Sequence, residues 1–155
     1  MLSTTRSAAA LSLFLLSCAA PAHAESPEDM VRAADQAFYQ ALSGRDLPAM
    51  MAVWANKPYV VSIGPRSKKM DIGADAVGKY WGGAFDYFSQ INATKTDARV
   101  RIEGNVAWVI GTETATLQPK SGGDALKFDT FVTHIFEKEG AAWKLVVHHA
   151  QMIPK

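Results

Sequence analysis

The chain has 155 residues, 48% of them hydrophobic, a length that suits one domain of roughly 100–200 residues rather than two. Charged residues make up 20%, and 11 Gly and 7 Pro follow no repeating period, which excludes a disordered or fibrous chain. The formal net charge is +1, and the densest cationic cluster, Arg66-Ser67-Lys68-Lys69, is too small for a nucleic-acid surface, so no nucleic-acid partner is expected.

The N-terminus has the pattern of an export signal. Arg6 precedes an apolar run at 8–16, and Ala22-His23-Ala24 offers an A-x-A cleavage site. The run is shorter than the ~20 apolar residues that span a bilayer. We therefore expect a signal peptide at 1–24, a periplasmic or secreted protein that begins at Glu25, and no membrane association after processing.

Cys18 is the only cysteine, and it lies inside the predicted signal. The processed chain would have no thiol, which excludes disulfides, thiolate metal sites and a cysteine nucleophile. Leu15-Leu16-Ser17-Cys18 loosely resembles a bacterial lipoprotein box. Lipidation at Cys18 is therefore the alternative to simple cleavage.

Helix signals follow the export signal. Ser26 is a hydroxyl N-cap before Pro27 and two acids, and the apolar residues after it repeat at helical spacing to about Gly44. Asp46 can cap a second, short helix that ends before Asn56-Lys57-Pro58. A third helix is expected at roughly 75–89.

Strand signals dominate the rest of the chain. The first predicted strand is 59–63, stopped by Gly64-Pro65. Four longer runs, separated by turn signals, lie at about 91–103, 106–117, 126–138 and 143–153. Helices first and a meander of strands afterwards predict an α+β fold, with an antiparallel sheet bent around the helices.

Several motifs together resemble the nuclear transport factor 2-like superfamily, and within it the SnoaL-like and ketosteroid-isomerase-like proteins. They are Phe38-Tyr39-x-x-Leu42, Arg45-Asp46-Leu47, Trp54, Gly64-Pro65, Gly73-Ala74-Asp75-Ala76-Val77, Thr133-His134-Ile135-Phe136, Glu139-Gly140, Trp143-Lys144-Leu145 and His149-Ala150-Gln151. The resemblance covers nearly all of 25–155. It implies a cone-shaped fold, with three N-terminal helices packed on a strongly curved antiparallel sheet around a pocket, often in a homodimer. This fold hosts enzymes, ligand carriers and assembly modules, so it does not specify the chemistry.

The catalytic groups of the ketosteroid isomerases are absent from this sequence. Those enzymes use a carboxylate base, together with a tyrosine and a protonated aspartic acid that bind the oxyanion. Counting from the shared motifs puts Phe38 at the tyrosine, Ser62 or Gly64 at the base, and Val132 at the second acid. None of these side chains can supply the required group, so ketosteroid isomerisation itself is not expected.

A set of polar side chains is predicted on one face of the sheet. Alternation along the second long run puts Glu113 among apolar or small neighbours. The favoured hairpin registers add Thr130 and His134, then His149 and Gln151, so that a carboxylate, two imidazoles, a hydroxyl and an amide converge. A one-residue change of register would flip a strand and scatter the set. The alternatives are a Glu113 on the solvated face and a His134 bonded to neighbouring backbone.

The same alternation places His148 on the opposite face, exposed or at a dimer interface. Adjacent strand histidines cannot chelate one metal from the same face, so neither a metal site nor a cofactor is expected. Four aromatic residues are candidates for lining the pocket: Tyr39, Trp54, Tyr59 and Trp81. The last three are most simply core residues, and for Trp54 and Trp81 a core role and a lining role overlap.

Three functions remain open. The first is a single exported domain that binds a small, mostly apolar organic molecule in the pocket. The second is an acid–base enzyme, such as an isomerase, dehydratase or cyclase, in which Glu113 or His149 moves the proton. The third is a homodimeric assembly module with a vestigial pocket. A homodimer through the sheet is expected in any case, because both faces of the last strand are largely apolar.

Overall fold

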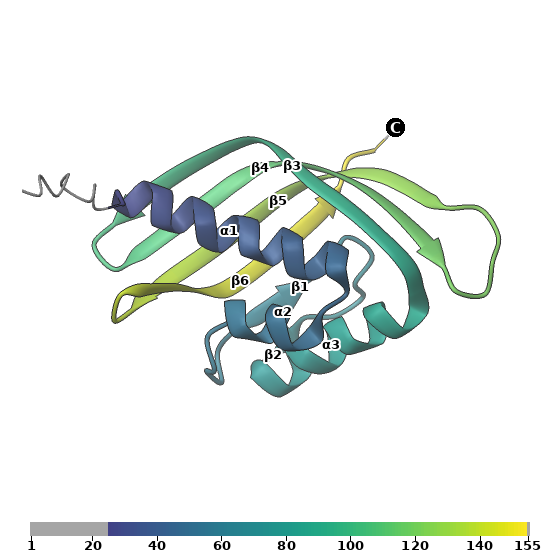
Figure 1. Ribbon diagram of the computed structural model, residues 1–155, viewed down its shortest axis with the longest axis horizontal. Helices are drawn as coiled ribbons and strands as arrows, with labels where there is room; N and C mark the ends of the chain where they lie inside the picture. Colours follow the sequence, from purple (N-terminus) through teal and green to yellow (C-terminus); the bar gives the residue numbers. More distant parts are fainter. Residues whose placement is uncertain (1–24, 155) are drawn as a thin grey trace, which may run out of the picture.

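The computed structural model describes residues 25–154 (Figure 1). The elements are α1 (Pro27–Gly44), α2 (Leu47–Val53), β1 (Val61–Ile63), β2 (Asp71–Ile72), α3 (Ala74–Tyr87), β3 (Phe88–Glu103), β4 (Val106–Pro119), β5 (Leu126–Glu139) and β6 (Ala142–Met152). The expected export signal lies outside the described residues. Within them, no helix is long and apolar enough to cross a membrane.

The first two helices begin at the predicted caps. The Ser26 hydroxyl accepts a hydrogen bond from the Asp29 N–H at 3.1 Å, and the Asp46 carboxylate accepts one from the Ala49 N–H at 2.9 Å. α1 ends at Gly44, and the C-cap residue Arg45 adopts the left-handed conformation with a φ of 50°. The predicted starts of α1 and α2 and the predicted end of α1 near Gly44 are therefore confirmed, while α2 ends at Val53.

The sheet has six strands in the order β2-β1-β6-β5-β4-β3. β3 to β6 form the predicted antiparallel meander. The predicted α+β fold is confirmed, but β1 pairs in parallel with β6 and β2 adds to its other edge, so the sheet is mixed rather than antiparallel throughout. The reason is that β1 is very short and its partner lies at the far end of the chain, so no local pattern sets the strand direction.

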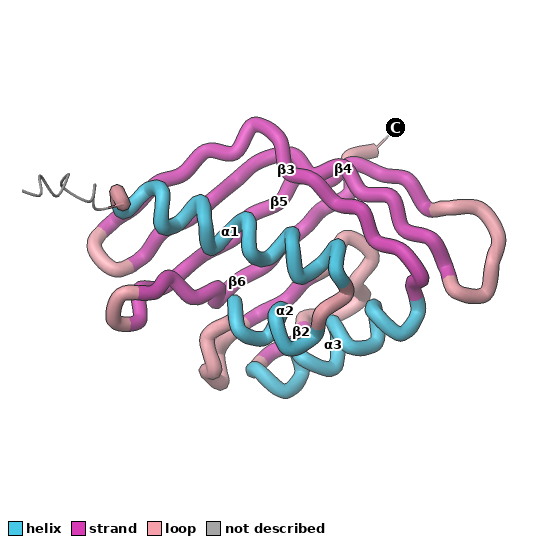
Figure 2. Tube along the Cα trace, in the orientation of Figure 1, coloured by secondary structure: helices cyan, strands magenta, loops and turns pink. Residues whose placement is uncertain are grey.

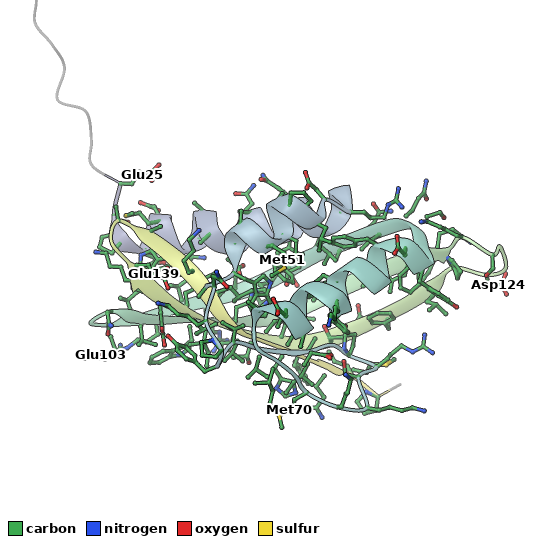
Figure 3. The ribbon with its side chains drawn as sticks, turned by 90° about the horizontal axis from the view of Figure 1, so that it is seen from below. Glu25, Met51, Met70, Glu103, Asp124 and Glu139 are labelled. Carbon is green, nitrogen blue, oxygen red and sulfur yellow. The ribbon has the colours of Figure 1, made fainter. Side chains whose placement is uncertain are left out.

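All three helices lie on one face of the sheet, with α1 along the long strands and α2 and α3 near one end of α1 (Figures 1 and 2). Figure 3 shows the opposite side of the sheet free of helices, and Met51 of α2 directed toward α3, where its sulfur packs beside Gly78. The core lies between the helices and the sheet, where Phe38, Met50 and Leu145 are fully buried.

One bulge in β3 depends on a glycine in the neighbouring strand. The pairing of β3 with β4 slips between Thr96 and Arg99, where Asp97 has a φ of 53°. Gly111 of β4 faces this bulge, and a Cβ atom there would lie 2.7 Å from the Thr96 carbonyl oxygen. Glycine therefore permits the close approach of the two strands.

A second irregularity reverses the faces of β6. Phe136 pairs with Leu145, but the preceding residue, Ile135, pairs with Val147, so Val146 is an extra residue in β6. Leu145 and Val146 are both buried, although they are adjacent in a strand. Every residue of β6 after Val146 consequently lies on the face opposite to the one that simple alternation predicts.

Candidate functional site

A cavity of about 450 Å³ lies between α3 and the sheet, and we call it the main cavity. Its wall is mostly apolar, with contributions from α3 and from strands β3, β4 and β5, including Trp81, Ala84, Ile91, Ala115, Leu117 and Phe128. Two of the lining residues carry a carboxyl or an imidazole, Glu113 of β4 and His148 of β6. Both are buried, so the polar chemistry of this cavity depends on their surroundings.

The Glu113 carboxyl is held by two hydroxyl groups. Tyr39 of α1 donates a hydrogen bond to Oε2 at 2.9 Å, and Thr130 of β5 donates a longer one to Oε1 at 3.4 Å. Burial raises the pKa of Glu113, and the Tyr39 hydrogen bond and the charge of Lys95 only partly oppose this. Glu113 therefore retains its proton to higher pH than an exposed glutamate does.

His148 is the end of a buried chain of hydrogen bonds. Asp35 Oδ1 lies 2.6 Å from His134 Nδ1, and His134 Nε2 lies 2.8 Å from His148 Nδ1. A carboxylate can only accept, so His134 donates through Nδ1–H, and its neutral ring then accepts at Nε2 from the Nδ1–H of His148. This assignment leaves a lone pair on His148 Nε2. Within the described residues that atom has no hydrogen bond, and the side chain lines the main cavity.

Burial, assisted by the charge of Lys95, keeps both imidazoles neutral. Burial lowers the pKa of His134 to about 4, and the nearby Lys95 ammonium acts in the same direction. Burial also lowers the pKa of His148 well below its ordinary value. Lys95 Nζ lies 2.6 Å from Asp35 Oδ1, with only 4% of the lysine side chain exposed. Although burial raises the pKa of Asp35, the His134 hydrogen bond and the Lys95 charge outweigh it and leave that pKa lowered.

Aromatic rings enclose the two imidazoles. The Phe38 ring stacks on His148 with centroids 5.1 Å apart, and its edge-on contact with His134 has centroids 4.6 Å apart. Trp81 packs edge-on against His148 at 5.4 Å. These apolar contacts explain the low pKa values of the imidazoles and limit the orientations that each ring can adopt.

The predicted register of β4 and β5 is confirmed. Glu113 pairs with Thr130, and Val109 pairs with His134, so the predicted carboxylate, hydroxyl and first imidazole lie on the inner face. Tyr39 joins them through its bond to Glu113, and Trp81 lines the main cavity.

The predicted face of β6 is wrong. His149 and Gln151 are exposed on the outer face, whereas His148, expected there, is 2% exposed on the inner face opposite His134. The extra residue Val146 is the physical reason, because it shifts the alternation by one position.

Two further aromatic candidates do not line the main cavity. Tyr59 precedes β1 rather than starting it, is 51% exposed, and donates a hydrogen bond to Glu137 at 2.7 Å. It is therefore neither a core residue nor a wall of the cavity. Trp54 is buried in the core beside the last strand, with which it forms a single bridge at Leu145.

Three features of this site were not predicted from the sequence: Asp35, Lys95 and the inward orientation of His148. A signal for Asp35 existed, since it interrupts the apolar stripe of α1 between Val31 and Phe38. Lys95 likewise follows Ile91 and Ala93 in the alternation of β3 and so belongs to the inner face. A charged residue at an inward position was thus the clue in both elements.

No group of three His, Cys, Asp or Glu side chains in residues 25–154 is arranged to hold a metal ion. In the chain of Asp35, His134 and His148, both ring nitrogens of His134 and the Nδ1 of His148 are engaged in hydrogen bonds, whereas His148 Nε2 is not. The arrangement is therefore suited to moving or holding protons.

Comparison with protein families gives a match over most of the chain. The family model described as "SnoaL-like domain" matches residues 31–154. No curated protein matches the chain.

Solved structures with the same fold are numerous. A proposed dehydratase of the NTF2-like family from Streptomyces avermitilis superimposes with a TM-score of 0.75 at 22% identity, covering 83% of this chain and 97% of that chain. A nuclear transport factor 2-like protein from Salmonella enterica also has a TM-score of 0.75, at 14% identity, with 83% and 92% covered. A ketosteroid isomerase-like protein from Erwinia carotovora superimposes with a TM-score of 0.69 at 18% identity, covering 82% of this chain and 96% of that chain. At these identities the likeness is one of fold.

Proposed function

From the premise that this chain belongs to the SnoaL-like family of the nuclear transport factor 2-like superfamily, we propose that it binds a small, mostly apolar organic molecule. The observation that carries the proposal is the main cavity, whose apolar wall is interrupted by Glu113 and His148. Its volume of about 450 Å³ falls within the ~300–1,000 Å³ of typical small-molecule sites. A purely structural module would have no need of such a space, which argues against the vestigial pocket of an assembly module.

The wall favours a neutral, flat or compact ligand with one hydroxyl or carbonyl group. Aromatic and aliphatic side chains supply the contact area, while the Glu113 carboxyl and the free nitrogen of His148 provide a donor or acceptor each. A charged group at this depth would lose its hydration without a complete set of partners. Arg66 is exposed at the rim and can meet a polar tail.

Binding of β-naphthol, followed by its fluorescence, tests this proposal. Leu117→Trp enlarges a side chain of the cavity wall and should weaken binding by about tenfold or more. The matched control is Thr116→Trp, the same change one residue earlier, outside the cavity lining. No saturable binding to the wild-type protein, or equal loss in both variants, would refute the proposal.

An acid–base enzyme is the second candidate, and a specific observation favours it. The main cavity holds two proton-transfer groups in different environments, a neutral His148 with a lone pair on Nε2 and a Glu113 whose pKa is raised by burial. One group can take a proton from the ligand while the other supplies one, as an isomerase, dehydratase or cyclase requires. In this role His148 takes the place that the sequence analysis gave to His149.

Exchange of the acidic C–H protons of β-tetralone in heavy water, followed by NMR, tests the second candidate. Wild-type protein should accelerate the exchange, and His148→Gln should remove the acceleration. His149→Gln changes the neighbouring histidine on the outer face and is the matched control. Equal rates in the two variants would contradict a role for His148.

We also propose that the protein is exported, because Arg6, the apolar run at 8–16 and Ala22-His23-Ala24 have the pattern of a cleaved signal.

We further propose that the protein forms a homodimer through the outer face of the sheet. Trp108, Ile110 and Phe131 on this face are 37%, 41% and 59% exposed, although all three are large and apolar. The register places them on adjacent strands, where they form one patch on the side without helices. A patch of this kind is typical of a protein–protein contact.

A further inference from the structure

The rim of the main cavity differs from its interior in charge. Inside, burial raises the pKa of Glu113 and lowers the pKa of His148, which favours the neutral form of each. At the rim lies Arg66, which is exposed and, among the described residues that line the cavity, is the only one with a cationic side chain at neutral pH. The cavity therefore combines a neutral interior with one positive charge at its mouth.

Arg66 belongs to a tight turn after β1, residues 64–67, which we call the rim turn. The Gly64 N–H donates a hydrogen bond to the Ser67 hydroxyl at 2.9 Å, and the Ser67 N–H donates one to the Gly64 carbonyl oxygen at 3.0 Å. Tyr80 of α3, which also lines the main cavity, packs so closely on this turn that a Cβ atom at Gly64 would overlap its hydroxyl. Glycine at this position lets α3 hold the rim turn, and with it the Arg66 backbone, beside the cavity.

The Arg66 guanidinium is not paired with a carboxylate of the protein. Among the ion pairs of residues 25–154, one joins the nearby Lys69 to Asp71 at 3.0 Å, but none includes Arg66. A guanidinium presents parallel N–H donors whose spacing matches the two oxygens of a carboxylate. Arg66 is thus placed to bind an anionic group of a ligand at the mouth of the main cavity.

We infer that the ligand is an amphipathic organic acid, whose apolar body fills the main cavity and whose carboxylate pairs with Arg66 at the rim. This inference rests on the proposed ligand binding and names the class of ligand. It makes Arg66 the residue that selects an acid over a neutral molecule of the same shape. An amine of that shape would bring a like charge to Arg66 and should be the weakest of the three.

The groups in the interior disfavour the opposite orientation of the acid. A carboxylate there would lose its hydration and would face the lone pair of His148 Nε2 and the Glu113 carboxyl, which already accepts hydrogen bonds from two hydroxyl groups. Lys95, which pairs with Asp35, is not among the residues that line the main cavity. The acid therefore enters with its apolar end first, and its carboxylate stays at the rim.

Binding of two probes that differ in charge tests this inference. Naphthylbutyrate carries a carboxylate on a flexible tail, naphthylbutyramide carries a neutral amide in its place, and naphthalene fluorescence reports the binding of both. At neutral pH, wild-type protein should bind the acid about fivefold or more tightly than the amide, as expected for a charged hydrogen bond at an exposed site. Arg66→Gln should remove this preference by weakening the binding of the acid alone.

Three further variants control the comparison. Lys68→Gln removes another exposed cation of the same loop, outside the lining of the main cavity, and should keep the preference. Arg66→Lys retains the charge without the planar pair of donors and should keep part of the preference. Leu117→Trp enlarges the cavity wall and should weaken both probes alike, as binding in the main cavity requires.

The outcomes separate the acid from the proposed function. Equal affinity of wild-type protein for the two probes, or a preference that Arg66→Gln leaves unchanged, would refute the acid, while amide binding that Leu117→Trp weakens would still support an apolar ligand. An equal loss of preference in Lys68→Gln and Arg66→Gln would indicate general attraction to a basic loop and would refute the specific pairing. If neither probe binds, the proposed function fails and the acid fails with it.

Discussion

His134 Nε2 and His148 Nδ1 lie 2.8 Å apart, so two buried imidazoles from neighbouring strands share one hydrogen bond. Because one nitrogen must donate and the other accept, the state of each ring depends on the other. Asp35 of α1 accepts the hydrogen bond from His134 Nδ1 and so sets which nitrogen of each ring donates. At the other end of the hydrogen-bonded chain, His148 lines the main cavity.

The stability of the protein should fall in mild acid. An unfolded histidine has a pKa of about 6.5, whereas burial lowers that of His134 to about 4. Between these values the unfolded chain binds more protons, so acid favours unfolding. The free energy of unfolding should drop by about 3 kcal/mol from about pH 7 to about pH 4, and His148 adds to it with the same sign.

Urea unfolding at a series of pH values measures this slope. His134→Gln should flatten it, whereas His149→Gln, on the outer face, should leave it unchanged. The lowered pKa of Asp35 adds a loss only at more acidic pH, as the carboxylate becomes protonated. A slope that is identical in His134→Gln and the wild type would contradict the burial of a neutral imidazole.

The free energy of unfolding of the Glu113→Gln variant, relative to that of the wild type, should increase as the pH rises. Burial raises the pKa of Glu113, so the folded state prefers the protonated carboxyl and loses stability when the pH rises through that pKa. Glutamine has no such loss, and its side-chain oxygen can still accept the Tyr39 hydrogen bond. Stability of variant and wild type, compared in urea at mildly acidic and mildly basic pH, checks the sign. A difference that moves the other way would indicate a carboxylate stabilised by Lys95.

Gly111→Ala should destabilise the protein by about 1–3 kcal/mol. The new Cβ would lie 2.7 Å from the Thr96 carbonyl oxygen, a backbone atom held by the bulge of β3. Gly83→Ala is the matched control, because nothing lies within 4 Å of a Cβ there and it sits inside α3. That variant should gain up to about 1 kcal/mol. Thermal or urea unfolding of the two variants gives the comparison, and a neutral Gly111→Ala would show that the bulge can move.

Phe131→Lys should convert a dimer into a monomer. The residue is 59% exposed in the apolar patch of the outer sheet face, and a lysine there would place a charge in the proposed interface. Light scattering measures the molecular mass at a protein concentration of roughly tens of micromolar, where a dimer with a Kd on the order of micromolar is populated. Ala33→Lys, on an exposed position of α1, is the control that should remain dimeric. A monomeric wild-type protein would exclude the interface.

The sequence by itself determined the three helices, the longer strands and their order, though not the two-residue strand β2, because the signals involved are local. Ser26 and Asp46 can cap only the residues that directly follow them, and both helices begin there. Alternation along β4 was sufficient to place Glu113 on the inner face, since no bulge separates it from the turn to β5 in the pairing with Thr130. The short motifs of both halves of the chain indicated the family for the same reason.

Only the tertiary structure decided which histidine of β6 enters the site and what holds it there. Leu145 and Val146 are both buried in the core, although they are adjacent in β6. The bulge that this burial requires shifts His148 inward and His149 outward. The parallel pairing of β1 with β6 and the meeting of Asp35 with His134 likewise join residues far apart in the chain. Their positions follow from burial of apolar surface and from the need of buried polar groups for partners, which no local pattern records.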